Sequence, residues 1–265
     1  ILLEAIKPNF WRPTIDIDFG GGLLTKLDVW NEASNSQVLR SVQFSNNSKI
    51  LNLDKNIKLS NGVTIETVYD LPSVKGQIKI TYKVNASGEI LVTNELKNLT
   101  KSLPHLPRFG NNFIINNDYQ VVEWFGRGPF ENYIDRNTAA LVGIYKSSVE
   151  DLYFPYIRPQ ENGYKTDVRW VSFKNTSGQG IKIEGAQLLG FSTHHQYNDD
   201  FDTGKSKQQR HTTDIKKRDF VNINIDYGQS GVGGDDSWTS KALPHEEFRI
   251  KPNNLNYSYR ILPVK

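Results

Sequence analysis

Short runs of alternating apolar and polar residues dominate the chain, and the spacing typical of amphipathic helices is almost absent. Residues 78–84 alternate in this way, residues 85–88 contain turn-forming Asn, Ser and Gly, and residues 89–96 form a second run. A period of two over such lengths predicts half-buried β-strands, and the short turn predicts a hairpin. Similar runs lie at residues 180–184, 220–227 and 257–262. At usual strand lengths and turn spacings the chain would hold about 15–20 strands.

Three segments do not follow this pattern. Residues 138–142 are the best candidate for a short helix. Residues 31–62 are rich in Asn and Ser and are interpreted as short edge strands joined by polar turns, whereas residues 198–209 are interpreted as an exposed loop. Neither an internal repeat nor a clear linker interrupts the sequence. We therefore predict one all-β domain that covers residues 1–265.

The composition is typical of a soluble globular protein. Of the 265 residues, 37% are hydrophobic and 23% are charged, and the net charge is only +3. Basic residues are scattered among acidic ones and no apolar run approaches the roughly 18 residues of a membrane-spanning helix, so neither nucleic acid nor a membrane is expected as a partner. The absence of Cys excludes disulfides and thiolate metal sites. Met is absent even from position 1, which predicts that the sequence is a piece of a longer polypeptide.

Four segments combine Gly, Pro, aromatic and charged residues in ways that a regular strand does not require. They lie at residues 10–20, 122–136, 155–170 and 231–238. The second begins as a strand that breaks at residues 126–129, because Gly allows positive φ and Pro fixes the exit direction of the chain. Glu131, Asn132, Asp135 and Arg136 follow within one short turn. Two interpretations remain open: the charged groups fix the loop by pairing with one another, or they contact a ligand.

The third segment has the same character. Two prolines bracket an extended stretch, and Glu161 and Asn162 precede a glycine. These two residues are interpreted either as parts of a fixed turn at the rim of a sheet or as members of a ligand pocket.

The fourth segment is a glycine-rich loop that ends in Trp238. It lacks the Lys and the spacing of a phosphate-binding loop, and the adjacent Asp235 and Asp236 would repel a phosphate. A core tryptophan normally lies within a strand, whereas one at a loop tip more often meets a partner or the face of a sugar. Trp238 is therefore a candidate contact residue, with core packing as the alternative.

The five histidines do not form a metal-binding spacing with nearby carboxylates. They are interpreted as structural or surface residues, with the exception of His211, which is a candidate to face a pocket. No metal site is predicted in this chain.

Taken together, the four segments resemble the C-terminal domain of the family 2 β-galactosidases. That family carries a W-x-G-x-G-P-x-E-N-Y-x-D-R run, as at residues 124–136, followed by Y-x-x-P-x-E-N-G and D-x-R-W, as at residues 156–163 and 167–170. It closes with G-x-G-G-D-D-S-W, as at residues 231–238, and its opening W-R-x-x-x-D-x-D-x-G matches residues 11–20. Ile17 departs from this pattern, because the family usually has Asn between the two aspartates, although Asp16 and Asp18 remain.

The resemblance implies an all-β fold, a large antiparallel β-supersandwich similar to galactose mutarotase. It also implies that the catalytic glutamates lie on a separate (β/α)₈ barrel, so that this chain alone is inactive. The magnesium and sodium ions of the family are bound on that barrel, and no cofactor is expected in this domain. The implied partners are a β-galactoside, the other domains of the same enzyme, notably the barrel, and further copies in a homo-oligomer. The resemblance does not distinguish between the bacterial cytoplasm and the periplasm as the location of the enzyme.

In the family, the tryptophan that matches Trp238 reaches the mouth of the active site and stacks on the sugar. The resemblance therefore implies that Trp238 binds substrate and that Asp235 and Asp236 shape its loop. The other candidates for loop-shaping or pocket contacts are Arg12, Asp16, Glu131, Asn132, Arg136, Glu161, Asn162 and His211.

Two further functions are compatible with this fold. An aldose 1-epimerase would use a His and a Glu in a central groove, with His211 and either Glu161 or Glu131 as candidates. A free-standing carbohydrate-binding module would bind galactosides without any other domain. A mutarotation assay with galactose and a galactoside-binding measurement on the isolated chain separate these two hypotheses from a β-galactosidase domain.

Overall fold

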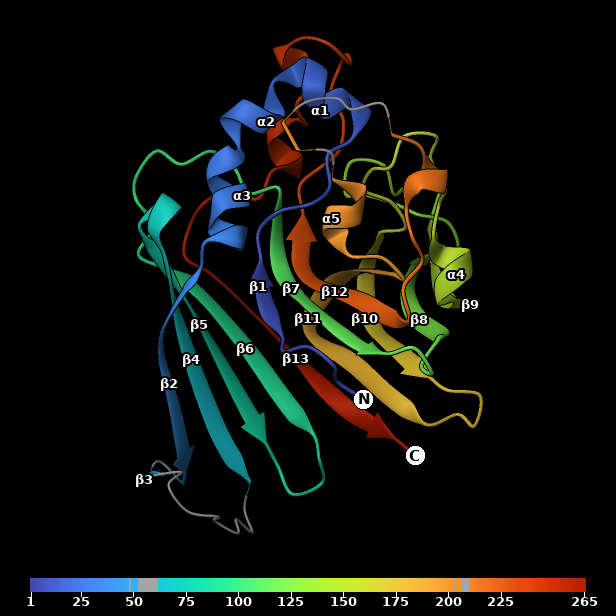
Figure 1. Ribbon diagram of the computed structural model, residues 1–265. Coiled ribbons are helices and arrows are strands. Elements are labelled where there is room, and N and C mark those ends of the chain that lie inside the picture. The colour runs from blue at the N-terminus through green and yellow to red at the C-terminus, as the bar shows by residue number, and fades with distance from the viewer. Residues whose placement is uncertain (48, 52–61, 203, 206–209) are drawn as a thin grey trace.

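The computed structural model describes residues 1–47, 49–51, 62–202, 204–205 and 210–265, and strands make up most of its regular structure (Figure 1). The strands are β1 (Lys7–Asn9), β2 (Val38–Asn46), β3 (Lys49–Ile50), β4 (Val63–Leu71), β5 (Gly76–Val84), β6 (Ile90–Lys97), β7 (Arg108–Asn116), β8 (Val121–Gly128), β9 (Leu141–Ser148), β10 (Lys165–Lys174), β11 (Gly180–His194), β12 (Phe220–Gln229) and β13 (Leu255–Val264). The helices are α1 (Asp16–Gly21), α2 (Leu23–Lys26), α3 (Asp28–Asn35), α4 (Val149–Leu152) and α5 (Asn198–Phe201), with 3₁₀ turns η1 (Pro72–Val74), η2 (Thr212–Asp214), η3 (Ser240–Ala242) and η4 (Glu246–Phe248).

All strand pairs are antiparallel, and the sheet branches at β11. The first half of β11, up to Gly185, pairs with β13, whereas the second half, from Gly190, pairs with β12. The other edge of β11 pairs with β10. Three branches therefore leave this strand: β13-β6-β5-β4-β2-β3, β12-β7-β1 and β10-β8-β9.

Two of these branches face each other as the layers of a sandwich. The Tyr257 hydroxyl on β13 donates to the carbonyl of Ile225 on β12 over 3.1 Å, and the Tyr259 hydroxyl donates to Asn111 Oδ1 on β7 over 2.9 Å. The apolar side chains between the layers include Ile78, Ile80, Val92, Leu96, Phe109, Phe113, Val221, Ile223 and Ile225. With 46% strand and 15% helix, the structure confirms the prediction of an all-β antiparallel fold.

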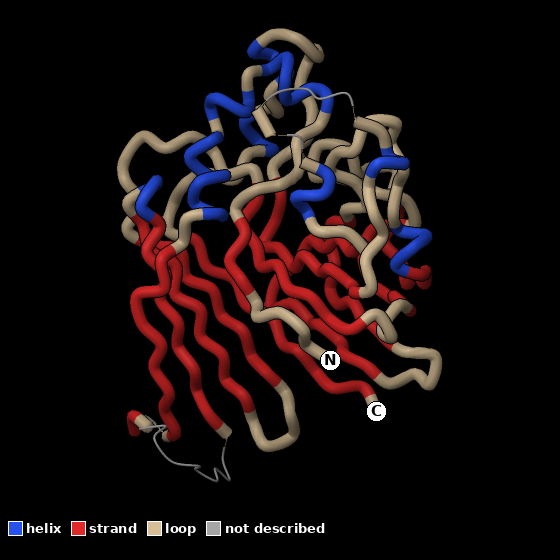
Figure 2. The backbone as a smooth tube through the Cα atoms, viewed as in Figure 1, coloured by secondary structure: helices blue, strands red, loops and turns tan. Residues whose placement is uncertain are grey.

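Helices and long loops gather at one end of the sheets, at the top of Figure 2, and hairpin turns lie at the other end. The segments at residues 10–20 and 231–238 lie outside the strands. The segment at residues 122–136 runs from β8 into the loop that follows it, and the segment at residues 155–170 is a loop up to residue 164 and then enters β10. The sheets therefore act as a support that brings these four segments to one end of the molecule.

The strands expected from alternation are confirmed. The predicted hairpin is formed by β5 and β6, whose register joins Gln77 to Lys97 and Val84 to Ile90. The runs at residues 180–184, 220–227 and 257–262 lie in β11, β12 and β13. The described residues hold 13 strands, fewer than expected. One reason is that β11 alone has 15 residues, far more than the usual 5–6 or so.

The predicted helix at residues 138–142 is wrong. The stretch begins as a turn, in which the N–H of Ala140 donates to the carbonyl of Asn137, and it continues into β9 from Leu141. Pairing of β9 with β8 supplies backbone hydrogen bonds that a lone helical turn of five residues could not provide.

Helical structure lies instead at residues 16–35, where the sequence shows little helical spacing. The helices have 6, 4 and 8 residues, too few for a periodic pattern to stand out. They are held by burial of Leu27 and Trp30 rather than by intrinsic propensity. The expected edge strands of residues 31–62 therefore start only with β2, and residues 52–61 lie outside the described residues.

The loop expected at residues 198–209 is only partly a loop. It begins with α5, whose Phe201 is 1% exposed and packs edge-on against the ring of His194. Residues 203 and 206–209 lie outside the described residues.

Candidate functional site

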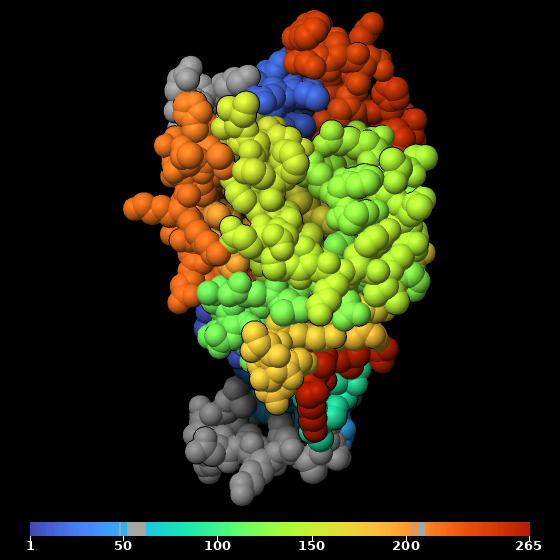
Figure 3. Space-filling view, turned by 90° about the vertical axis from the view of Figure 1, so that its right-hand side faces the viewer, coloured from blue at the N-terminus to red at the C-terminus, as the bar shows by residue number. Residues whose placement is uncertain are grey.

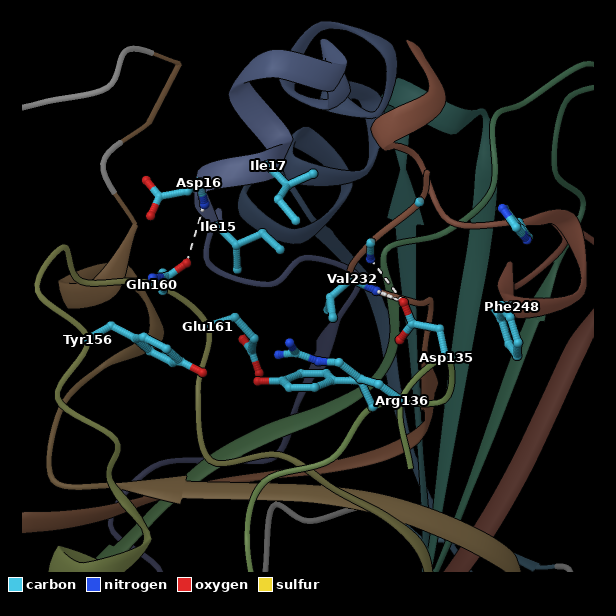
Figure 4. Close-up of a pocket in the computed structure, with 14 residues that line it drawn as sticks. Ile15, Asp16, Ile17, Asp135, Arg136, Tyr156, Gln160, Glu161, Val232 and Phe248 are labelled. Carbon is cyan, nitrogen blue, oxygen red and sulfur yellow. Dashed lines mark hydrogen bonds between the residues drawn. The ribbon is translucent and has the colours of Figure 1, made fainter. Parts of the chain in front are cut away.

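Loops from all four unusual segments surround one cavity of about 450 Å³ (Figure 4). In Figure 3, the green and yellow-green segments around residues 130–165 lie directly below the blue N-terminal helices and the red C-terminal loop. The lining residues are Ile15, Asp16, Ile17, Tyr133, Asp135, Arg136, Tyr156, Gln160, Glu161, Val232, Gly233, Gly234, His245 and Phe248. This meeting of distant segments makes the cavity the candidate functional site.

A buried cluster of charges forms the floor of this cavity. The Arg108 guanidinium is fully buried and contacts Glu161 Oε1 and Asp226 Oδ2, each at 3.0 Å. Beside it, the Arg12 guanidinium donates two hydrogen bonds to the Asp18 carboxylate, at 2.7 and 2.9 Å. Of these five residues, Glu161 alone lines the cavity. Arg12 therefore does not line the cavity, and pairing offsets the large desolvation cost of these charges.

The floor contains one more acid than base. Arg12 and Arg108 face Asp18, Glu161 and Asp226. Burial raises the pKa of Asp226 to about 7, even though Arg108 lowers it, and burial also raises the pKa of Glu161. Burial therefore favours the protonated form of both acids, and it does so for Asp226 up to about neutral pH.

The raised pKa of Asp226 makes stability depend on pH. The folded protein keeps a proton that the unfolded chain has already released, so this stabilisation is complete below about pH 4 and is lost as the pH rises through about 7. Asp226→Asn cannot ionise. We therefore expect the wild type to lose stability relative to this variant from about pH 5 to about pH 8, as measured by urea unfolding midpoints.

Glu184→Gln is the matched control for this experiment. Hydrogen bonding to Lys182 lowers the pKa of Glu184, so its titration lies below the tested range. Identical pH profiles for the wild type and Asp226→Asn would contradict a raised pKa of Asp226 in the folded protein.

Glu131 and Asn132 connect the loop after β8 to residues 156–163 and to the start of β10. Glu131 accepts hydrogen bonds from the Tyr156 hydroxyl and, over 2.8 Å, from the Gly163 N–H. Asn132 Oδ1 accepts from the N–H and the hydroxyl of Thr166, at 2.9 and 2.6 Å. Of the two interpretations made from the sequence, these contacts support the one in which the two residues fix the loop.

Asn162 fixes the third segment from below. Its Oδ1 accepts from the Phe154 N–H over 3.1 Å and lies 2.9 Å from His194 Nε2, and its amide donates to the Gln160 carbonyl over 2.9 Å. Burial lowers the pKa of His194 to about 3, so the ring is neutral at physiological pH. A neutral ring donates from Nε2 to the Asn162 oxygen.

Arg136 and Asp16 line the cavity itself. The Arg136 side chain is 58% exposed, and its guanidinium lies 4.9 Å from the Tyr133 ring centre and 3.7 Å from Glu131. Asp16 Oδ1 accepts from Arg158 Nε over 2.7 Å. In Figure 4, Asp16 and Gln160 lie on one side of the cavity and Asp135 and Phe248 on the other.

Asp135 joins two walls of the cavity. The sequence marks it as a loop-fixing or ligand-contacting residue but does not indicate its partners in the fourth segment. Its Oδ2 accepts hydrogen bonds from the N–H groups of Val232 and Gly233, each over 2.9 Å. The close approach requires Gly231, because a Cβ at that position would lie 2.8 Å from Asp135 Cγ. The glycines of the fourth segment were the available signal, since they allow a backbone to approach a neighbouring group closely.

The loop that carries Trp238 is held by several hydrogen bonds. Asp236 Oδ1 accepts from the N–H groups of Trp238 and Thr239, at 3.1 and 2.9 Å. The Asp235 N–H donates to the Lys241 carbonyl over 2.8 Å, and the Asp235 carboxylate lies 2.8 Å from His245 Nε2. The Trp238 side chain itself is 75% exposed and lies outside the cavity lining.

The Trp238 loop also packs closely against α1. A Cβ on Gly20 would lie 2.1 Å from the carbonyl oxygen of Ser237, so only glycine fits between them. The glycine that ends the first segment therefore permits its contact with the fourth.

His211 is not brought to the cavity. Its side chain is 61% exposed beside Asp214, and its N–H donates to Asp214 Oδ2 over 2.8 Å. The structure thus places neither Glu161 nor Glu131 beside His211, and the three residues do not form one site.

Sequence reasoning missed the buried charges on the strands. Arg108, Lys165 and Asp226 are each at most 1% exposed. Burial lowers the pKa of Lys165 to about 8, and its ammonium donates to the Gly163 carbonyl over 3.0 Å. No motif marks these residues, because a charge in an alternating strand is ordinarily a solvent-facing one.

Within the described part of the chain, no group of three or more His, Asp or Glu side chains is arranged to hold a metal ion. In the same residues, no helix is long and apolar enough to cross a membrane.

Known proteins provide a comparison for this architecture. The family model of the β-galactosidase small chain matches residues 1–261. The β-galactosidase of Priestia megaterium is 31% identical over 245 residues, which are 92% of this chain and 22% of the relative. That of Pseudoalteromonas haloplanktis is 32% identical over 266 residues, or 97% of this chain and 24% of the relative. The chain thus spans about a quarter of the length of these relatives.

Solved structures align more weakly. The galactosidase domain of the α-galactosidase–sucrose kinase AgaSK gives a TM-score of 0.41 at 9% identity, covering 86% of this chain and 27% of that one. A GalM/aldose epimerase homologue from C. elegans gives 0.38 at 10% identity, covering 78% and 66%. The chain belongs to the β-galactosidase small-chain family.

Proposed function

We propose that this chain is the non-catalytic rim domain of a β-galactosidase that hydrolyses terminal β-D-galactosides by a retaining mechanism. In this proposal the catalytic carboxylates lie on a barrel domain outside the chain, and any magnesium or sodium belongs to that domain. Support comes from the family match and from relatives named β-galactosidase that are about four times longer.

The carboxylates of the cavity favour a supporting role. Retaining hydrolysis needs two carboxyl groups about 5–5.5 Å apart that both reach the sugar. Here Glu161 is buried against Arg108, Asp135 accepts two backbone hydrogen bonds, and Asp16 pairs with Arg158. Each is engaged in holding a loop or the floor, so we assign none of them to bond cleavage.

Trp238 is the observation that carries the proposal. Its indole is 75% exposed, yet its loop is closed by backbone hydrogen bonds and capped by Asp236. An exposed large ring on a fixed loop is a ready platform for the apolar face of a pyranose, and such a contact contributes about 1 kcal/mol or more. Because the loop is fixed beforehand, binding orders few additional groups.

We expect Trp238→Ala to lower kcat/KM for lactose and aryl β-galactosides about tenfold in the complete enzyme, because the stacking surface is lost. Trp238→Phe keeps an aromatic face and should retain most of the activity. Steady-state kinetics on both variants measures the effect.

Leu141→Ala on β9 is the matched control, because Leu141 is 71% exposed and lies on an edge strand away from the cavity lining. The proposal fails if Trp238→Ala leaves kcat/KM at the level of this control. Mutarotation of galactose by the isolated chain would instead favour the epimerase hypothesis.

A further inference from the structure

The branch β6-β5-β4-β2 has one charged face and one apolar face. On the outer face, Lys79 Nζ lies 3.4 Å from Glu66 and 2.9 Å from Glu95, and the Gln77 amide donates to Asp70 over 2.8 Å. Paired charges of this kind are suited to solvent.

The inner face, which is turned toward the layer β12-β7-β1, is largely apolar, although Thr67 on β4 and Asn94 on β6 also lie on it. Its cross-strand rows run from β2 through β4 to β5 and comprise Leu39–Tyr69–Ile78, Val42–Thr67–Ile80 and Phe44–Ile65–Tyr82. One apolar face and one polar face are the pattern of a sheet that is covered on a single side.

The covering layer does not extend over the whole inner face. The Tyr82 hydroxyl on β5 donates to the carbonyl of Ile6 over 3.2 Å, which marks the edge of the layer. Ile78 and Ile80 on β5 are fully buried, whereas Leu39 and Val42 on β2 are 52% and 44% exposed. In Figure 1, β2 and β4 lie on the left, beyond β1. Among the described residues, the apolar rows are therefore covered at β5 but partly exposed at β2.

We propose that the inner faces of β2 and β4, around Leu39, Val42, Phe44 and Ile65, are the docking surface for another domain of the β-galactosidase. This inference rests on the proposed function, which makes the chain one domain of a larger enzyme. The occupant presents an aliphatic or aromatic surface, because the rows offer no charge to pair with.

The length of the relatives favours this occupant over a second copy of the chain. More than three quarters of each of the two relatives lies outside the region matched here, so a large amount of polypeptide is available to cover the sheet. Contiguous apolar surface is rare on isolated soluble domains, and it commonly marks an interface. The charged outer face of the same strands needs no such cover.

The absence of Cys from this chain allows a site-specific test in the complete enzyme. Leu39→Cys and Val42→Cys report on the inner face, and Ser41→Cys and Gln43→Cys on the same strand report on the outer face. All four positions are exposed in this chain by itself. Thiol labelling, located by peptide mass spectrometry, is expected to be at least about tenfold slower at positions 39 and 42 than at 41 and 43. Equal labelling rates would overturn the proposal.

A second measurement tests whether the surface is instead covered by a second copy of this chain. If two copies of the chain covered each other, the isolated chain would sediment as a dimer and Val42→Asp would make it monomeric, which would overturn the assignment to another domain. We expect the isolated chain to sediment as a monomer.

In the complete enzyme, Val42→Asp should increase hydrogen exchange in β2, with Gln43→Asp as the control. Trp238→Ala is measured separately by kinetics, so failure of the rim proposal and failure of this docking surface give different results.

Discussion

Replacing Arg108 with Met is expected to destabilise the protein by about 3–5 kcal/mol, the largest effect of any single substitution considered. The guanidinium is fully buried and serves both Glu161 and Asp226 at 3.0 Å. Met keeps much of the volume but removes the positive charge, so two buried acids lose their nearest cation. Domains have a total stability of only about 5–15 kcal/mol, so the loss is readily measured by urea unfolding.

Arg260→Met is the matched control. Its side chain is 52% exposed and pairs with Glu184 over 2.9 Å, and exposed pairs contribute no more than about 1 kcal/mol. The triple variant Arg108→Met, Glu161→Gln, Asp226→Asn should recover part of the loss, because no charge is left unpaired. Equal losses in the two arginine variants would mean that the buried cluster does not stabilise the fold.

Replacing Gly190 with Ala is expected to cost about 3 kcal/mol through overpacking. A Cβ at this position would lie 1.8 Å from the Tyr164 hydroxyl oxygen and 2.4 Å from its Cζ. The Tyr164 ring cannot easily move, because it is 1% exposed and stacks on Tyr133 at 5.8 Å. Since Tyr133 lines the cavity, the variant should also disturb the candidate site.

Gly228→Ala provides the control for Gly190→Ala. It lies on the neighbouring strand β12, and its nearest contact would be Ile250 Cδ1 at an ordinary 3.8 Å. We expect a change within about 0.5 kcal/mol. Thermal or urea unfolding of both variants decides the matter, and a loss in Gly190→Ala no larger than in Gly228→Ala would show that the Tyr164 ring yields to the extra methyl group.

The four motif segments could be found from sequence, and so could most strands, but the way in which the segments meet could not. Glu131, Asn132 and Asn162 are read from the sequence as loop-fixing or ligand-contacting residues, and the structure shows their contacts within the protein. Asp135 bonds to backbone groups almost 100 residues away in the chain. A contact over such a separation leaves no local pattern.

The buried charged residues beneath the cavity could not be predicted from the sequence for a related reason. In residues 220–227, alternation predicted one apolar face and one solvent-facing polar face. The apolar residues Val221, Ile223 and Ile225 are buried as expected, but the polar residues Asn222, Asn224 and Asp226 are also buried, at 0–1% exposure. The second face is covered by segments from elsewhere in the chain, including Glu161 and Asn198.

The sequence by itself determined which side chains share a strand face and where the chain turns, since both depend on a residue and its near neighbours. Only the tertiary structure decided what covers each face: polar loops over β12, an apolar layer over β5, and an incomplete cover over the inner face of β2, where Leu39 and Val42 are 52% and 44% exposed. Covering is decided by segments far apart in the chain, so alternation within one strand carries no information about it.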